Sequence, residues 1–460
     1  MIDTTSRYRS LVLMNNRLIL QIIVFNVMIF GLVVVSSRFP GLAFWGGCGI
    51  VIYLCLLALR ATHKTFYLVC GIKLTFDAFW FLKIPGFEEI GLLELFIIPI
   101  LLLLFLKAST VKRSLLGIVG LTSVYVLWVL ISMVLNGLNP DLTLVMRQSG
   151  ILIGLLMGIA FIGSEERFDL AIFLVFLSTI IPVFALLFQY VLSRMNIFIF
   201  HQKIDSFRGI RLSGLYYDPA TMGMVGLISL SCCLYLLYKK IYSKRTQKYI
   251  YFYIVCNTVA IIIGSTRAIL IGFVIVFIVY LAISYRPMLK LLPFIIGVFI
   301  IFFPYIGKAI ERTTVWEIRK NIGSAQISVK DAFRETEYRT MLTGRISIWQ
   351  DIWVEFQNGS LIQRYFGSGL SSDAHSSYFF LILQIGWLGL ALYLGINLKI
   401  LSMLWKSKVR KLPQKLGILS ILLVLCVGLS ATAVIYTSFQ WISYFFMGGV
   451  LAMPKAGPRN

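Results

Sequence analysis

Five basic side chains are candidates for chemistry, because each lies at or near one face of an otherwise apolar chain. They are Arg147, Arg211, Arg267, Arg345 and His375. A planar guanidinium group can hold two oxygens of one phosphate through parallel N–H donors. A histidine can accept a proton near neutral pH. Together these residue types predict a site for a phosphate-bearing anion, with a proton acceptor beside it.

Each of these residues also has a structural explanation. Arg147 and Arg211 can lie at membrane interfaces, where the charged group reaches water and the stem stays in apolar surroundings. Arg267 can do the same, although a charge inside an apolar segment costs roughly 2.5 to 3.5 kcal/mol at a helix centre. Arg345 can be one solvated charge among several in a loop, and His375 an ordinary histidine at a helix boundary. These alternatives stay open at the level of the residues alone.

The elements that must position these side chains are predicted to be membrane helices. Of the 460 residues, 59% are hydrophobic and only 13% are charged, whereas charge in soluble proteins is nearer 25%. Apolar runs of about 18 residues or more recur along the chain, and each can span the hydrocarbon. The runs lack the alternation of a barrel strand, so their backbone groups must be satisfied within helices. The predicted fold class is therefore an all-α polytopic transmembrane helical bundle of about 12 to 14 spans.

The candidate spans follow one another from end to end of the chain. They are 18–35, 41–59, 66–84, 89–106, 115–135, 144–162, 168–192, 214–238, 249–264, 267–284, 289–305, 376–398, 416–437 and 438–452. The third span carries Lys73 and Asp77, and the last is short, so either can be re-entrant. The organisation that results is a helical bundle over 1–306, a large periplasmic loop with short helices over 307–375, and C-terminal transmembrane helices over 376–460.

The distribution of charge predicts the orientation of the bundle. Lys and Arg number 42 against 19 Asp and Glu, for a net charge of +23. With the N-terminus inside, most of this excess falls in the inner connections, as in 239–248 and 399–415, which agrees with the positive-inside rule. The excess therefore needs no nucleic acid as partner. The loop 307–375 lies outside in this arrangement, and Trp349, Ile352, Trp353 and Phe356 are spaced as in a helix.

Other common kinds of site find no support in the sequence. The seven cysteines all fall in apolar stretches without a paired CxxC spacing, so neither a metal centre nor a disulfide framework is predicted. Nucleotide-binding glycine motifs and metalloprotease spacings do not occur. No metal ligand and no cofactor is expected.

Three segments of the chain resemble those of a known family, and they occur in the same order as in that family. TGRISIWQDIW followed by YFGSGLSSDAHSSYFFLILQIGWLGLALYL is similar to the C-terminal signature of the bacterial O-antigen ligase and polysaccharide polymerase superfamily, of Wzy type. RLSGLYYDPATMGMVGL resembles an outer loop and helix start of that family, and GSTRAIL resembles its Ser-Arg segment. The residues that carry the signature are Gly344, Arg345, Trp349, Phe366, Gly367, Gly369, His375, Gly386 and Gly389. Two departures are the residue inserted between Ser265 and Arg267, and the lack of an Asn after His375.

The resemblance implies a fold similar to C-type glycosyltransferases and an enzyme of the inner membrane. It implies polymerisation of undecaprenyl-pyrophosphate-linked oligosaccharide repeat units, as for O-antigen or exopolysaccharide, by an inverting, metal-independent transfer on the periplasmic face. The resemblance makes His375, Arg345 and Arg267 catalytic. It makes Arg211, Arg147, Tyr217 and Trp349 binding residues for the pyrophosphate or the glycan. A chain-length regulator and a flippase are partners that such a role implies, beside the membrane lipids.

Two other functions remain open. An O-antigen ligase shares these parts and differs in its acceptor, the lipid A core instead of another lipid-linked unit. The short segment between Arg345 and His375 and the breadth of the polymerase group favour a polymerase. A flippase or transporter also carries charged residues in its spans, but its usual inverted repeats and broken helices are not evident in the sequence.

Overall fold

A computed structural model of the protein describes most of the helical part of the chain. The described residues are 16–36, 38–79, 81–84, 87–91, 95–107, 112–135, 142–195, 197, 203–205, 209–216, 218–239, 244–263, 267–283, 292–293, 296–297, 345–369, 376–407, 409, 411–430 and 437–454. His375 and Tyr217, two of the predicted site residues, lie outside this set. Predicted span 289–305 also lies almost wholly outside it.

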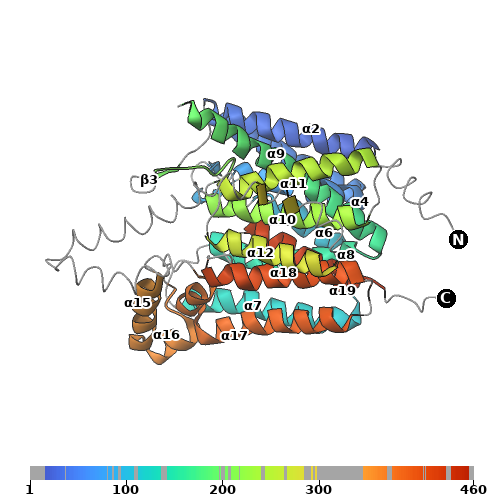
Figure 1. Ribbon diagram of the computed structural model, residues 1–460. Coiled ribbons are helices and arrows are strands. Elements are labelled where there is room, and N and C mark those ends of the chain that lie inside the picture. The colour runs from blue at the N-terminus through green and yellow to red at the C-terminus, as the bar shows by residue number, and fades with distance from the viewer. Residues whose placement is uncertain are drawn as a thin grey trace.

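The described residues form a bundle of helices with two short β-hairpins (Figure 1). The helices of the bundle are α2 (Asn16–Val35), α3 (Pro40–Arg60), α4 (Thr62–Phe76), α6 (Ile97–Lys107), α7 (Leu116–Leu135), α8 (Leu142–Phe161), α9 (Glu165–Arg194), α10 (Pro219–Lys239), α11 (Lys244–Ile263), α12 (Arg267–Ile283), α17 (Ser377–Lys406), α18 (Lys411–Ser430) and α19 (Thr437–Ala452). The smaller elements are the 3-10 turns η1 (Asp77–Phe79) and η3 (Arg113–Leu115), the strands β1 (Lys83–Ile84), β2 (Phe87–Gly91), β3 (Lys203–Asp205) and β4 (Gly209–Arg211), and the helices α15 (Arg345–Asn358) and α16 (Leu361–Phe366).

The bundle has the composition of a multi-pass membrane protein. Among the described residues, eight helices are long and apolar enough to cross a bilayer, and four more apolar helices are shorter. Large apolar side chains point away from the bundle, and Trp45 and Phe105 are 71% and 79% exposed. A soluble protein rarely exposes apolar surface on this scale, whereas hydrocarbon tails accept it without cost. The prediction of a polytopic helical membrane bundle is confirmed to this extent.

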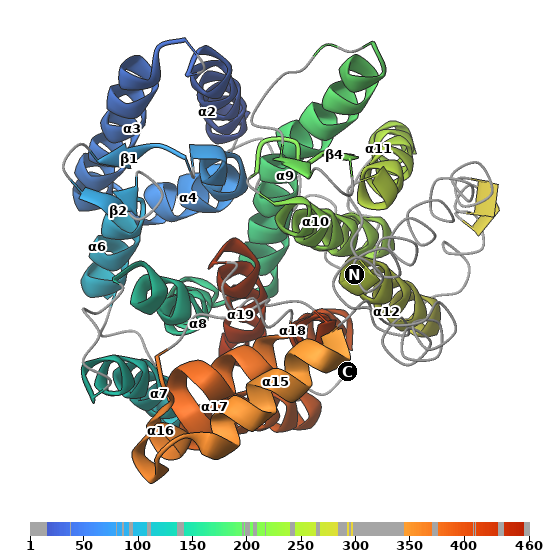
Figure 2. The ribbon, with the colours of Figure 1, turned by 90° about the vertical axis from the view of Figure 1, so that its left-hand side faces the viewer.

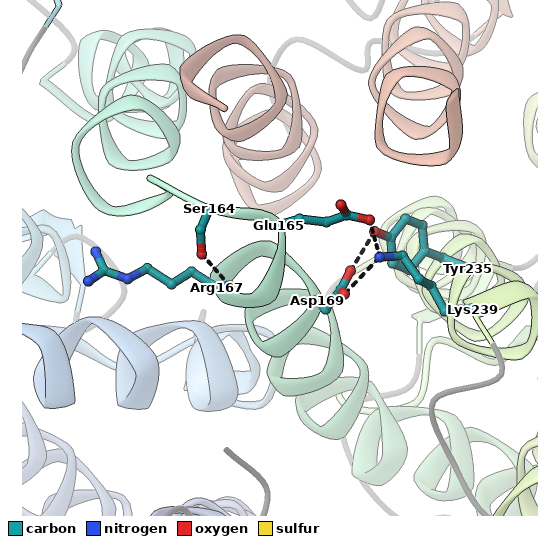
Figure 3. A network of polar contacts seen from close by, with 6 residues as sticks. All are labelled: Ser164, Glu165, Arg167, Asp169, Tyr235 and Lys239. Carbon is teal, nitrogen blue, oxygen red and sulfur yellow. Dashed lines mark hydrogen bonds and ion pairs between the residues drawn. The ribbon is translucent and has the colours of Figure 1, made fainter. Parts of the chain in front are cut away.

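The two ends of the bundle differ in structure. The β3–β4 hairpin, α15 and α16 lie at the same end of the bundle, which we call the cap end, with the hairpin on the opposite side from the two helices (Figures 1 and 2). The opposite end contains the start of α9 and the end of α10, where Lys239 bonds Asp169 at 2.9 Å and also pairs with Glu165. Figure 3 shows both carboxylates turned toward this lysine, while the Tyr235 hydroxyl donates to Asp169 at 2.6 Å. The network ties the ends of two long helices together.

Several predicted element boundaries were wrong where short elements interrupt the apolar pattern. The span predicted over 66–84 is a helix that already ends at Phe76, and the one predicted over 89–106 begins as a helix only at Ile97. Between them lies the antiparallel β1–β2 hairpin. A second antiparallel hairpin, β3–β4, precedes α10. The fold is therefore helical with two small hairpins, rather than purely α.

Helices α8 and α19 pack backbone to backbone, because glycines replace side chains between them. Gly154 and Gly158 are one turn apart on α8, and Gly448 of α19 faces Leu155. A Cβ atom at Gly154 would overlap the Trp441 carbonyl oxygen, and one at Gly158 the Phe445 carbonyl oxygen. Small residues at such spacing let membrane helices approach backbone to backbone.

We expect Gly154→Leu to push α8 and α19 apart. The clash is with backbone, which cannot rotate away, so the change should cost at least the roughly 1 to 3 kcal/mol typical of overpacking. Thermal unfolding in detergent measures this loss. Gly120→Leu is the matched control, since nothing lies within 4 Å of a Cβ built on Gly120. Equal melting temperatures for the two variants would contradict the packing assigned here.

Candidate functional site

The glycine motifs near the C-terminus interlock at the cap end. Gly386 interrupts α17 with φ +69°, and Gly367, which ends α16, has φ +84°. A Cβ atom at Gly386 would overlap the Tyr365 carbonyl, and one at Gly367 would overlap the Gln384 backbone. Only glycine adopts both the left-handed backbone and the close approach without strain. The FG-x-G segment and the break in α17 therefore form one unit, which we call the clamp.

The break leaves carbonyl groups of α17 without helical partners, and neighbouring elements supply them. The backbone N–H of Ser368 donates to the Leu383 carbonyl at 2.6 Å. The Ser132 hydroxyl reaches the Gln384 carbonyl at 3.0 Å, and the Trp128 indole N–H reaches the Ile385 carbonyl at 3.1 Å. In apolar surroundings each unpaired group costs several kcal/mol. Helix α7 and the clamp thus stabilise a broken helix that the apolar pattern did not predict.

Two of the motif-bearing helices contact the last turn of α18. On α12, a Cβ atom at Gly272 would lie 3.2 Å from Val427 of α18. On α17, the Ser376 hydroxyl donates to the Gly428 carbonyl at 3.4 Å. Arg267 is the first residue of α12, and α17 begins directly after the segment with His375. The start of α17 and the second turn of α12 therefore both contact the last turn of α18 at the cap end.

Helix α15 brings a third motif to the same place. Its Trp349 stacks on Phe379 in the first turn of α17, with ring centroids 5.3 Å apart. Arg345 begins α15 one helical turn before Trp349, so the two residues share a face of the helix. Further along, Trp353 and Phe356 pack edge-on against Trp387. The helix predicted from the spacing of these aromatics is present and covers the start of α17.

The loop after Arg211 is anchored deep in the bundle. Residues 212–216 are all buried, and the Tyr216 hydroxyl donates to the Leu74 carbonyl of α4 at 2.7 Å. The Gly214 N–H donates to the Gln189 side chain at 2.8 Å. Beside this loop, Lys73 and Asp77 form an ion pair with each residue only 4% exposed. Arg211 itself closes the β4 strand, at the cap end (Figure 2).

The predicted site residues are thus brought together in part. The described contacts connect α12, α15 and α17 through the last turn of α18 and through the Trp349–Phe379 stack. Arg267 and Arg345 are the first residues of α12 and α15, and His375 lies outside the described residues. Trp349 lies among them through its stack on Phe379. Arg147 is half-buried in the second turn of α8, and no described contact joins it to these helix starts.

Sequence reasoning missed a set of buried amides and hydroxyls that the bundle encloses. Gln148 and Gln384 are each 1% exposed, and Asn397 and Gln440 are fully buried. Each is a polar residue in an otherwise apolar run, which is the signal that could have found it. In the sequence, Lys73 and Asp77 suggested only that their span is re-entrant. Buried charges in a membrane helix, however, mark functional sites by default.

Comparison with known proteins leaves the site to be interpreted from its own geometry. Within the residues that the structure describes, no three His, Cys, Asp or Glu side chains gather in a way that could hold a metal ion. No protein-family model matches the chain. No curated protein matches it either.

Proposed function

We propose that the protein polymerises undecaprenyl-pyrophosphate-linked oligosaccharide repeat units in the inner membrane. The observation that carries the proposal is that α12 and α17 both contact the last turn of α18, while α15 stacks Trp349 on Phe379 in the first turn of α17. An anion that arrives through the membrane needs cationic groups at one end of an apolar bundle. Arg267 and Arg345 are the first residues of two of these helices. A helix N-terminus also favours a bound phosphate through its free N–H groups.

The proposed transfer is a single inverting displacement. The hydroxyl oxygen of the acceptor sugar attacks the anomeric carbon, and the bond from that carbon to the pyrophosphate oxygen breaks. The lipid pyrophosphate leaves with the electron pair, and Arg211, Arg267 and Arg345 stabilise its added charge as preorganised donors. His375 takes the proton of the attacking hydroxyl. Arg147, Tyr217 and Trp349 hold the donor and its glycan.

A deletion strain tests this function through its lipid-linked glycans. For a polymerase, long chains should disappear while single lipid-linked units accumulate. Loss of transfer to lipid A core, with long lipid-linked chains retained, would instead indicate a ligase. A ligase performs the same chemistry with the lipid A core as its acceptor. A wild-type glycan profile in the deletion strain would contradict both the polymerase and the ligase function.

The proposed orientation puts the cap end on the periplasmic face. Its support is the excess of Lys and Arg in the connections at the opposite end, for example Lys112 and Lys239. A reporter that is active only in the periplasm should be active when fused near residue 325, and inactive when fused within 240–243. The reverse pattern would put the clamp on the wrong side for a lipid-linked donor.

Replacing each arginine with lysine should impair transfer even though the charge is kept. A lysine ammonium is a point charge and cannot reproduce bidentate contacts with a pyrophosphate. We expect Arg211→Lys, Arg267→Lys and Arg345→Lys to lower the rate of chain growth per folded molecule. Arg38→Lys is the matched control, because Arg38 is exposed between α2 and α3. Full activity at all three positions would refute the pyrophosphate role.

A flippase or transporter is a second candidate, favoured by two observations. Helix α17 is broken at Gly386, and broken helices are typical of transporter binding sites. The buried Lys73–Asp77 pair is of the kind found in proton-coupled carriers. Proteoliposomes decide between the functions: movement of a lipid-linked unit between leaflets without chain growth would favour the transporter.

A further inference from the structure

A line of polar side chains runs along the contact between α7 and α17, behind the clamp. The two helices are antiparallel, so Ser132 lies opposite Gln384 and, further in, the Tyr125 ring lies 6.0 Å from the Tyr393 ring. From α8, Gln148 accepts a hydrogen bond from the Tyr125 hydroxyl at 2.7 Å. We call these five residues the polar seam. All five are at most 1% exposed.

The polar seam contains groups that the bundle leaves without partners. Among the described residues, neither the oxygen nor the nitrogen of the Gln384 amide has a hydrogen-bond partner, and the Gln148 amide nitrogen has none. A buried group left unpaired costs about 1 to 3 kcal/mol. The unpaired atoms of these two amides therefore destabilise the folded protein.

Asn397, one turn beyond Tyr393, is a buried amide whose nitrogen and oxygen are both hydrogen-bonded within the bundle. Its nitrogen donates to the Tyr393 carbonyl at 2.8 Å, and its oxygen accepts from the Tyr444 hydroxyl at 2.8 Å. Both hydrogen bonds hold neighbouring backbone and side chains together. The contrast with Gln384 indicates that the polar seam is built for an occupant rather than for helix contact alone.

The chemistry of the seam identifies the class of that occupant. Its five side chains are neutral, and their amides and hydroxyls both donate and accept. A charged ligand would find no counter-charge among these five residues, and burying it would be costly. A hydroxyl group satisfies either end of an amide, and the faces of Tyr125 and Tyr393 suit the apolar side of a sugar ring.

We infer that the polar seam is a binding site for a neutral sugar residue of the lipid-linked glycan. The identity of the ligand as a glycan rests on the proposed function. The seam begins at the clamp, where Ser132 contacts both the Phe366 and the Gln384 carbonyls. A sugar held there lies directly behind the FG-x-G segment, so the seam selects the glycan while the arginines select the pyrophosphate.

The test is thermal unfolding of the full-length protein in a detergent without a sugar headgroup. Glucose and N-acetylglucosamine are the probes, and glycine betaine at equal osmolarity is the control without hydroxyl groups. Binding to the folded state lowers the unfolding constant by the factor 1 + [L]/Kd, about elevenfold at ten times Kd. One of the two sugars should therefore raise the melting temperature beyond the effect of betaine.

Two amide variants locate the effect. Gln384→Met removes two unpartnered atoms, so without sugar its melting temperature should equal or exceed that of the wild type, and the sugar effect should vanish. Gln414→Met is the matched control: its amide donates to the Leu404 carbonyl at 2.9 Å, so its melting temperature should fall while the sugar effect remains.

Three results would overturn the inference. They are no sugar effect beyond that of betaine, an undiminished effect in Gln384→Met, or a clear loss of stability in Gln384→Met without sugar. The first result leaves water as the only occupant. None of them bears on polymerisation, which the glycans of the deletion strain report independently.

Discussion

His375→Ala should lower the rate of glycan transfer by about a hundred-fold to ten-thousand-fold, which is the contribution typical of a positioned general base. His375 is one of only three histidines in the chain. Without it the acceptor hydroxyl must lose its proton to water as it attacks. Binding of the lipid-linked donor should persist, since the arginines hold its pyrophosphate. Turnover per folded, membrane-inserted molecule is the quantity to measure.

The pH dependence provides an independent readout of the same role. A general base acts only when it is unprotonated, so the wild-type rate should fall as the pH drops below about 6.5, the usual histidine pKa. The alanine variant should lack this step. His201→Ala is the comparison, because His201 falls in the predicted outer connection 193–213, whereas His63 falls on the predicted cytoplasmic side. A His375→Ala enzyme within a few-fold of wild type would end the proposal, and so would equal losses of expression and activity.

The sequence predicts the bundle well because membrane helices follow from a single physical requirement. Backbone groups in hydrocarbon must bond within their own segment, so a long apolar run specifies a helix without knowledge of its neighbours. Helices α2, α3 and α7 coincide closely with the predicted spans 18–35, 41–59 and 115–135. The hairpins and the short helices α4 and α6 depart from the prediction because their ends are decided by tertiary contacts. The Tyr216 bond to the Leu74 carbonyl is one such contact, and it joins residues 142 positions apart.

The motifs of the candidate site are visible in the sequence, but the packing between them is not. Arg345 and Trp349 were identified by type and spacing, and the helix that carries them is present. What the sequence does not reveal is that FG-x-G and the glycine of the following helix pack against each other. That contact depends on serine and tryptophan side chains of α7, more than 250 positions away from their acceptors, which restore hydrogen bonds of the broken helix. Pairings at such separation leave no periodic signal in a single sequence.

Gly386→Ala should disrupt the clamp more than any other single methyl group added to α17. The backbone at Gly386, with φ +69° and ψ −175°, lies in a region that is essentially limited to glycine and costs other residues roughly 1 to 3 kcal/mol. The new methyl group would also overlap the Tyr365 carbonyl. Relief requires the FG-x-G segment to move away from α17, and the Ser368 bond to Leu383 would be lost with it. Gly395→Ala is the matched control on the same helix, because nothing lies within 4 Å of its added methyl group and alanine favours a helix by about 1 kcal/mol over glycine. We therefore expect Gly386→Ala to lower the melting temperature and to slow glycan transfer in the molecules that remain folded, whereas Gly395→Ala should leave transfer unchanged. If both variants melt and turn over alike, the clamp does not position the start of α17.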